Sequence, residues 1–205
     1  MKHLIITRLK YREKDLFMTR LNLLNEILIP CLKNQTNQNF RLCVMMHDED
    51  VELSKSIIDY DFITFEDYTV LKKYTIDNNI NIQTRHDSDD FMFDNYIDKI
   101  QTEYNLLIDK NDIFLLQFQP EKVNYHTGEI MPLPLYTNTC ISGFVTLCQK
   151  NVKYIVYERS HTTMHEITPN IYTYPKGYVK YYIHGDNDSL IPREERIKKW
   201  IYNNQ

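Results

Sequence analysis

A group of acidic residues directly follows an alternating run in the middle of the chain, between Ile80 and Ile97. In residues 80–85 apolar or β-branched side chains alternate with polar ones, and this period of two predicts a β-strand. After the acidic turn Asp87–Asp90, apolar side chains recur at helical spacing, at Phe93, Tyr96, Ile97 and Ile100. The order strand, acidic turn and helix is typical of α/β proteins, which bind ligands where strands end.

The turn Asp87–Asp90 has two interpretations. Asp87 and Asp89 stand two positions apart, so in an extended turn both can point carboxylate oxygens at one ion of the Mg²⁺ or Mn²⁺ type. Acidic and hydroxyl side chains also cluster in turns and helix caps, where they bond to nearby backbone groups. The preceding strand, Arg85 and the amphipathic helix that follows favour the metal site, because carboxylates placed there face a ligand.

The overall composition excludes several classes of protein. With 205 residues, of which 42% are hydrophobic and 25% charged, the chain is long enough for one ordinary globular domain. Its net charge of −4 does not favour a nucleic-acid partner, and it has no run of about 18 apolar residues that would predict a transmembrane segment. The four cysteines lack CxxC spacing and sit among apolar residues, so we expect reduced, buried thiols in a cytoplasmic protein.

Up to residue 104 the chain alternates between strand and helix patterns. Besides the central strand, the predicted strands are His3–Thr7, Phe40–Met46 and Phe62–Phe65, and the predicted helices are Leu16–Leu32 with an interruption near Pro30, Val51–Tyr60, Asp67–Asn78 and Phe91–Tyr104. This alternation predicts a parallel sheet flanked by helices, in the arrangement of nucleotide-binding α/β proteins.

After residue 104 short strands dominate the pattern. The predicted elements are the strands Asp112–Gln119, Lys122–Tyr125, Ile130–Leu133, Tyr154–Arg159 and Tyr178–Ile183, the apolar stretch Thr139–Leu147, and a terminal helix Pro192–Tyr202. We therefore expect a single domain over residues 1–205. Residues 1–104 would form its nucleotide-binding half, and residues 105–205 would shape the side that receives a second substrate.

Polar residues at the ends of the early strands are candidates for contacts with a nucleotide. Thr7 and Arg8 end the first strand, and Arg85 ends the central one, where guanidinium groups match phosphate or base; solvated loop cations are the alternative. Asp48 follows the second strand, where it can accept a hydrogen bond from a base or ribose or cap the next helix.

Three motifs in the chain resemble those of one enzyme family. Residues Thr84–Asp90 match the pattern T-R-x-D-x-D-D, residues Pro30–Phe40 match P-x-L-x-x-Q-T-x-x-x-F, and residues His184–Asn187 match H-G-x-N. Together they resemble the rhamnosyltransferase group of the GT-A nucleotide-sugar glycosyltransferases, and the chain is also similar to the first domain of an algal-virus capsid glycosyltransferase. His86 departs from the pattern, because the family usually has an apolar residue there.

This resemblance implies an α/β GT-A fold and a hexosyltransferase that uses a UDP-sugar, with rhamnose or a glucose-like sugar as the donor. It implies Mn²⁺ or Mg²⁺ held by Asp87 and Asp89, with Asp87 also at the nucleotide-sugar, and with a histidine from a later strand. His184 is the first choice for that histidine and His161 the alternative. For a virus-encoded protein the cytoplasm would be that of the host.

The resemblance further implies an acceptor glycan, on a glycoprotein, and a carboxylate that takes the proton of its hydroxyl group. Asp90, Glu158 and Asp186 are the candidates for that catalytic carboxylate. Whether the transfer inverts or retains the configuration of the sugar stays open.

Two other functions remain open at this point. A phosphoryl-transfer enzyme or nuclease could use the same carboxylates with two metal ions, helped by Asp48 and Asp50, although the chain has no glycine-rich phosphate loop. A non-catalytic carbohydrate-binding module would explain 16 tyrosines beside only 4 glycines, since tyrosine rings stack on sugars, but it needs no acidic turn between strand and helix.

Overall fold

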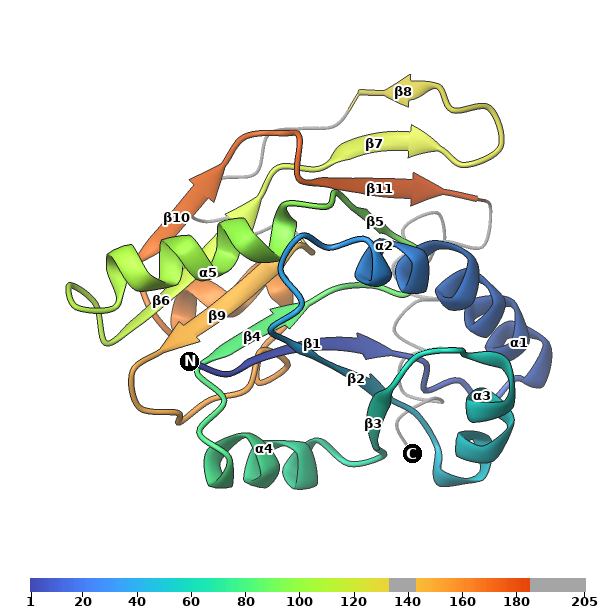
Figure 1. Cartoon of the computed structure of the whole chain (residues 1–205), viewed down its shortest axis with the longest axis horizontal. Helices are drawn as coiled ribbons and strands as arrows, with labels where there is room; N and C mark the ends of the chain where they lie inside the picture. Colours follow the sequence, from blue (N-terminus) through green and yellow to red (C-terminus); the bar gives the residue numbers. More distant parts are fainter. Residues whose placement is uncertain (133–142, 185–205) are drawn as a thin grey trace.

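The computed structural model describes residues 1–132 and 143–184, and this part of the chain forms two β-sheets (Figure 1). The larger sheet has seven strands in the order β10-β6-β9-β4-β1-β2-β3 among the described residues. Its strands are β1 His3–Arg8, β2 Arg41–Met45, β3 Phe62–Phe65, β4 Ile82–Arg85, β6 Ile113–Phe118, β9 Val145–Gln149 and β10 Ile171–Tyr174.

Most neighbours in the larger sheet run in parallel. β1 lies between β2 and β4, with Ile5 opposite Leu42 on one side and Thr84 on the other, and β2 pairs in parallel with β3. β9 runs antiparallel between β4 and β6, and β10 is parallel to β6. The parallel strands β1 to β4 therefore end along one side of the sheet, which we call the carboxyl edge, and begin along the opposite amino edge.

Helices cover both faces of the larger sheet because successive side chains of each strand point to opposite faces. Ile5 packs on one face with Phe17, Leu28 and Ile100, which come from α1 Lys14–Leu23, the π-helical turn Leu24–Leu28 and α5 Tyr96–Leu107. Leu4 and Ile6 pack on the other face with Leu71 of α4 Tyr68–Asp77. The remaining helical segments are α2 Ile29–Lys33, α3 Val51–Ile57, and the 3-10 turns Asp48–Asp50 and His161–Glu166.

The helix that was predicted over Leu16–Leu32 is present, with its interruption near Pro30. α1 and α2 are joined by the π-helical turn, in which the N–H of Ile29 reaches back to the carbonyl of Leu24. Pro30 stands in the first turn of α2 and has no N–H to donate, so the wider turn forms where the regular hydrogen-bond ladder is broken.

A second, smaller sheet of four strands lies above the larger one in Figure 1, in the order β5-β11-β7-β8 among the described residues. β11 pairs antiparallel with β5, directly after the acidic turn, and parallel with β7. The strands of the small sheet are β5 Phe91–Met92, β7 Glu121–Asn124, β8 Ile130–Met131 and β11 Val179–Ile183.

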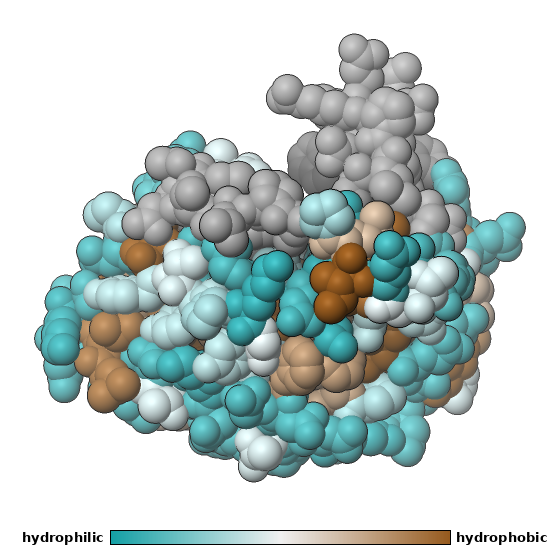
Figure 2. Space-filling model, turned by 90° about the horizontal axis from the view of Figure 1, so that it is seen from above, coloured by the Kyte–Doolittle hydropathy of each residue, from teal (hydrophilic) through white to brown (hydrophobic). Residues whose placement is uncertain are grey.

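The surface of the molecule is mixed in hydropathy. On the side seen in Figure 2 the described residues are mostly hydrophilic, with hydrophobic side chains in small separate groups.

The helix prediction for Phe91–Tyr104 was wrong at its start. Phe91 lies opposite Lys180 and Met92 opposite Val179 in the small sheet, and α5 begins only at Tyr96. The helical spacing of the apolar residues is satisfied from Tyr96 onward. The first two residues instead pair with a strand far along the chain, which local spacing does not reveal.

The strand prediction for Tyr154–Arg159 was also wrong, because this segment forms an irregular turn. Two buried glutamines hold its backbone: Gln83 donates to the Tyr154 carbonyl at 3.0 Å and accepts from the Val156 N–H at 3.1 Å. Gln149 accepts from the Tyr154 N–H at 3.0 Å. Side-chain amides thus supply the hydrogen bonds that a neighbouring strand would otherwise provide. β10, by contrast, was not predicted at all.

Several predictions lie outside the described residues: the helix Pro192–Tyr202, the candidate carboxylate Asp186, and Cys140. Cys31, Cys43 and Cys148 are described, and all three are buried free thiols, as predicted. Within the described ranges, the helices are too short or too polar to cross a lipid bilayer.

Candidate active site

The acidic turn lies at the carboxyl edge, directly after β4. The N–H of His86 donates to the carbonyl of Ile6, which continues the pairing with β1, and the chain then turns through Asp87–Asp90. Asp89 and Asp90 are buried, whereas the side chain of Asp87 is 46% exposed. The three aspartates therefore face different surroundings although they are neighbours in the sequence.

Asp89 forms the centre of a buried charge cluster with Arg20 and His184. Its Oδ2 atom accepts a hydrogen bond from Nη1 of Arg20 in α1, and it lies 2.7 Å from Nε2 of His184, directly after β11. The side chains of all three residues are at most 7% exposed. Burial alone would raise the pKa of Asp89, but the hydrogen bond from His184 and the charge of Arg20 hold it below its ordinary value.

The structure thus brings together two of the three predicted metal ligands, Asp89 and His184, and adds Arg20, which was not predicted. The sequence did carry a signal for Arg20. It stands three positions after Phe17 and four before Leu24, on the stripe of the helix that faces the core. A buried arginine on such a stripe needs a carboxylate partner.

Asp90 connects the acidic turn to the small sheet. Its Oδ1 atom accepts the backbone N–H of Tyr182 in β11 at 3.0 Å. Burial, together with the neighbouring charges of Asp89 and Asp87, raises the pKa of Asp90 well above its ordinary value. Asp90 is therefore a buried carboxyl group that anchors β11, and its role as the catalytic carboxylate stays a prediction.

His86 lies between β4 and the carboxylates of the acidic turn, inside the core. The ring is fully buried, with its centroid 5.3 Å from that of Phe144, and Nε2 lies 3.1 Å from the Asp90 carbonyl. Burial lowers the pKa of His86 to about 4, so the ring is neutral at physiological pH. A neutral imidazole can pack in the core much as an apolar side chain would, and its Nε2–H also donates to the backbone carbonyl of Asp90.

A second group of side chains lies beside Asp87, and we call it the Arg85–Tyr157 cluster: Tyr68, Arg85, Asp87 and Tyr157. Nε of Arg85 lies 3.9 Å from Oδ1 of Asp87, and its guanidinium carbon lies 4.9 Å from the centre of the Tyr157 ring. Tyr157 in turn stacks on Tyr68 at 5.6 Å between ring centres. Nothing in the sequence distinguished these two tyrosines from the other fourteen.

Thr7, Arg8 and His161 belong to the same neighbourhood. Thr7 is fully buried at the end of β1, and the charge of Arg8 acts on both Tyr68 and Tyr157. Burial first, and then the charge of Arg85, lower the pKa of His161 to about 4, against the opposing effect of Asp87. The charges of the Arg85–Tyr157 cluster thus act on the pKa of His161, whereas His184 lies within hydrogen-bond distance of Asp89.

Asp48 and Glu158 lie on the periphery. Asp48 lines a hollow of about 630 Å³ at the carboxyl edge, together with charged neighbours such as Lys10 and Glu66. The cap residues of the two helical segments that follow are His47 and Asp50, and neither makes a side-chain cap hydrogen bond. Glu158 follows Tyr157 but pairs with Lys72 of α4 at 3.0 Å. Both stay predicted site residues.

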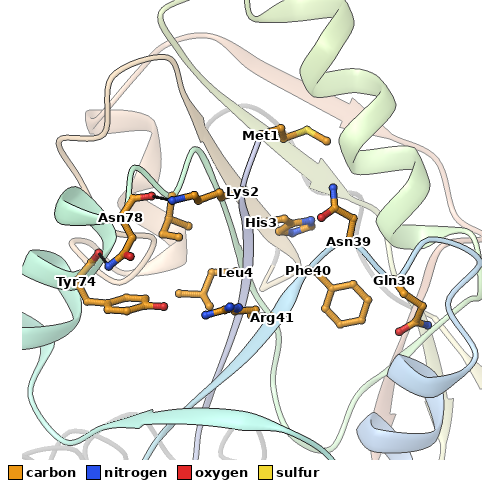
Figure 3. A pocket seen from close by; sticks show the side chains of 11 residues that line it. Met1, Lys2, His3, Leu4, Gln38, Asn39, Phe40, Arg41, Tyr74 and Asn78 are labelled. Atoms are coloured by element: carbon orange, nitrogen blue, oxygen red, sulfur yellow. Dashed lines mark hydrogen bonds between the residues drawn. The ribbon is translucent and has the colours of Figure 1, made fainter.

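A different hollow, of about 280 Å³, lies at the amino edge. Figure 3 shows it between the start of β1, the loop before β2 and the end of α4. Lys2 and Arg41 line it with amide and aromatic side chains, and no carboxylate is among the described residues that line it. Nζ of Lys2 donates to the Asn78 carbonyl at 2.6 Å. None of the predicted site residues is here.

Comparisons with known proteins found similar structures but no similar sequence. The sequence matches no protein-family profile and no curated protein. The structure of S. aureus TarS 1-349 in complex with UDP-GlcNAc superposes with a TM-score of 0.58 and 13% identity, over 99% of this chain and 65% of that one. The same TarS fragment in complex with UDP gives a TM-score of 0.52 at 13% identity, over 89% and 61%. The chain therefore spans less than two thirds of TarS 1-349.

A cytidylyltransferase from Leptospira borgpetersenii superposes with a TM-score of 0.52 and 13% identity, over 86% of this chain and 76% of that one. Identities this low show a shared fold and nothing more. The expected fold class is confirmed: the chain has an α/β, GT-A-like fold built on a mostly parallel sheet flanked by helices.

Proposed function

We propose that this chain is a glycosyltransferase that uses a nucleotide-sugar donor. The observation that carries the proposal is the Arg85–Tyr157 cluster, in which a guanidinium lies over an aromatic ring beside the partly exposed carboxylate of Asp87. Aromatic faces stack on flat bases, carboxylates accept from ribose hydroxyls, and guanidinium groups pair with phosphates. The same fold holds UDP-GlcNAc and UDP in the TarS complexes.

The narrower assignment rests on the sequence resemblance. It makes the donor a UDP-sugar, with rhamnose or a glucose-like hexose, and the acceptor a glycan on a glycoprotein. The enzyme itself would be cytoplasmic. The catalytic carboxylate is not assigned by this proposal. Of the three candidates, Asp90 is held by the N–H of Tyr182, Glu158 pairs with Lys72, and Asp186 lies outside the described residues.

A divalent ion, Mn²⁺ or Mg²⁺, is part of the proposal, and Asp89 and His184 fit it. They offer a carboxylate oxygen and an imidazole nitrogen 2.7 Å apart, which are donors that Mn²⁺ accepts. In the described part of the chain no three His, Cys, Asp or Glu side chains gather around one point, so water and phosphate oxygens would complete the shell. When bound, such an ion neutralises the departing diphosphate.

The first test is a thermal-shift screen with UDP-, GDP- and dTDP-sugars, each with and without Mn²⁺. A ligand that binds only the native state raises the melting temperature by mass action, so we expect UDP-sugars with Mn²⁺ to give the largest rise. Asp87→Asn should reduce that rise, and Asp59→Asn, a fully exposed carboxylate paired with Lys33, should not. If no nucleotide or nucleotide-sugar shifts the melting temperature, the proposal is wrong.

Nucleotidyl transfer is the second candidate, because the cytidylyltransferase shares the fold over three quarters of its own length. In that reaction a phosphate of the substrate attacks the α-phosphorus of a nucleoside triphosphate, so that the nucleoside monophosphate is transferred and pyrophosphate leaves. The loop after β1, residues 9–13, contains no glycine that would let the backbone wrap closely around a triphosphate, which counts against it. Release of pyrophosphate from CTP or UTP with sugar phosphates, without sugar transfer, would decide for this alternative.

A further inference from the structure

Arg20 occupies the place that a cation at Asp89 would need. Its Nη1 atom donates to Oδ2 of Asp89 and lies 3.4 Å from Nε2 of His184, so one guanidinium edge touches both proposed ion ligands. The same carboxylate oxygen serves Arg20 and His184 at once. If a divalent ion bound to Asp89 and His184, it would therefore lie within a few ångströms of the Arg20 guanidinium.

Two positive charges at this spacing repel each other strongly, because the three side chains are buried and little water screens them. An ion that binds Asp89 must therefore either displace Arg20 or be accompanied by an anion. A nucleoside diphosphate supplies such an anion, and arginine pairs well with phosphate oxygens.

We propose that Arg20 competes with the divalent ion for Asp89, and that the diphosphate of the donor removes this competition by pairing with the guanidinium. Arg20 is then a positioning residue that makes the ion and the nucleotide bind together. The inference rests on the proposed function for the ion and for the identity of the anion. The test separates the two, because the binding of Mn²⁺ alone measures the competition and the binding of UDP measures the proposed function. By linkage, the factor by which the diphosphate tightens the binding of the ion equals the factor by which the ion tightens the binding of the diphosphate.

The test measures the binding of Mn²⁺ itself, from the loss of the electron paramagnetic resonance signal of the free ion, with and without UDP. For Arg20→Met we expect Mn²⁺ alone to bind at least about tenfold more tightly than to the natural chain, in the range of ordinary coupling effects. UDP should then enhance Mn²⁺ binding less than it does in the natural chain. Arg41→Met, an exposed arginine at the start of β2, should change neither value.

Because Arg20→Met leaves Asp89 with one partner fewer, its folding is checked by thermal melting, and Arg20→Gln is measured alongside. Glutamine is neutral but still donates a hydrogen bond, so we expect the same tighter binding of Mn²⁺. If folded variants without the charge bind Mn²⁺ no more tightly than the natural chain, the inference is overturned. If they do bind it more tightly while UDP binds to none of the proteins, the competition holds and the proposed function fails.

Discussion

The two edges of the larger sheet differ in how far their charged side chains are exposed to solvent. At the amino edge, Lys2 donates to a backbone carbonyl and Arg41 is exposed to solvent around the hollow of Figure 3. At the carboxyl edge, the side chains of Arg20 and Asp89 pair with each other and are 5% and 7% exposed. The first arrangement costs little to fold, whereas the second desolvates two charges.

The comparison shows that an open hollow alone does not identify a site. Buried ion pairs contribute little net stability, because the cost of desolvation offsets most of the attraction between the charges. A cluster such as Arg20–Asp89–His184 therefore needs another explanation, and the binding of a charged ligand provides one. Among the described residues, the amino edge has no comparable buried charge cluster, so a variant of a residue there is a control for nucleotide binding at the carboxyl edge.

The largest effect is expected when the buried pair is broken from the side of the carboxylate. Asp89→Asn leaves the guanidinium of Arg20 without its counter-charge, so we expect the free energy of unfolding to fall by about 3–5 kcal/mol. Urea denaturation measures this. Glu52→Gln removes a carboxylate that is 87% exposed and pairs with Lys55, and it should cost no more than about 0.5 kcal/mol. Equal losses in both variants would contradict the difference between buried and exposed charge.

A smaller effect is expected on the affinity for nucleotide. Tyr157→Leu removes the ring that carries the guanidinium of Arg85, and loss of one aromatic stacking partner costs about 1–3 kcal/mol of binding. Titration calorimetry with UDP checks this. Tyr74→Leu is the matched control, since Tyr74 packs on the same face of the sheet but lines the amino-edge hollow. If both variants bind UDP equally, the nucleotide does not use the carboxyl edge.

The smallest effect is a pH dependence that belongs to the amino edge. Burial lowers the pKa of His3 to about 3, below the ordinary value near 6.5 that it regains on unfolding. Above pH 6.5 its contribution to stability is complete. As the pH falls below that value the unfolded chain binds the extra proton, and stability drops by up to about 1.4 kcal/mol per pH unit.

Urea denaturation between pH 7 and pH 5 measures this slope. His3→Gln should flatten it, and His126→Gln, at an exposed position, should leave it unchanged. His86 and His161, whose pKa values are also lowered, add slopes of the same sign. The role of His3 is therefore read from the difference in slope between the His3→Gln and His126→Gln variants. An identical slope in both variants would show that His3 takes up its proton without unfolding.

Strands with long apolar runs could be predicted from the sequence alone, because such residues are rarely found outside a core. β1, β2, β3 and β6 were found in this way, with boundaries that differ from the structure by at most one residue. β5 and β10 could not be found, since they depend on partners distant in the sequence. The segment Tyr154–Arg159 misled the prediction because glutamine side chains, rather than a strand, satisfy its backbone.

For the site, the pattern of Thr84–Asp90 predicted where the acidic group would lie but not how its members divide. Asp89 and His184 meet as expected, whereas Asp87 lies with Arg85 instead. That division depends on which aspartate points into the core, and neighbouring positions in a turn do not fix it. Tyr68 and Tyr157 come from a helix and an irregular turn far apart in the sequence, so only the fold brings them together.

The cluster around Asp89 also implies an order of assembly during synthesis. Arg20 and Asp89 are 69 positions apart, whereas His184 is 95 positions beyond Asp89. A growing chain that folds from its N-terminus can therefore neutralise the buried carboxylate with Arg20 well before β11 has left the ribosome. Arg20 thus compensates the buried charge of Asp89 in the incomplete chain, before β11 and His184 have been synthesised.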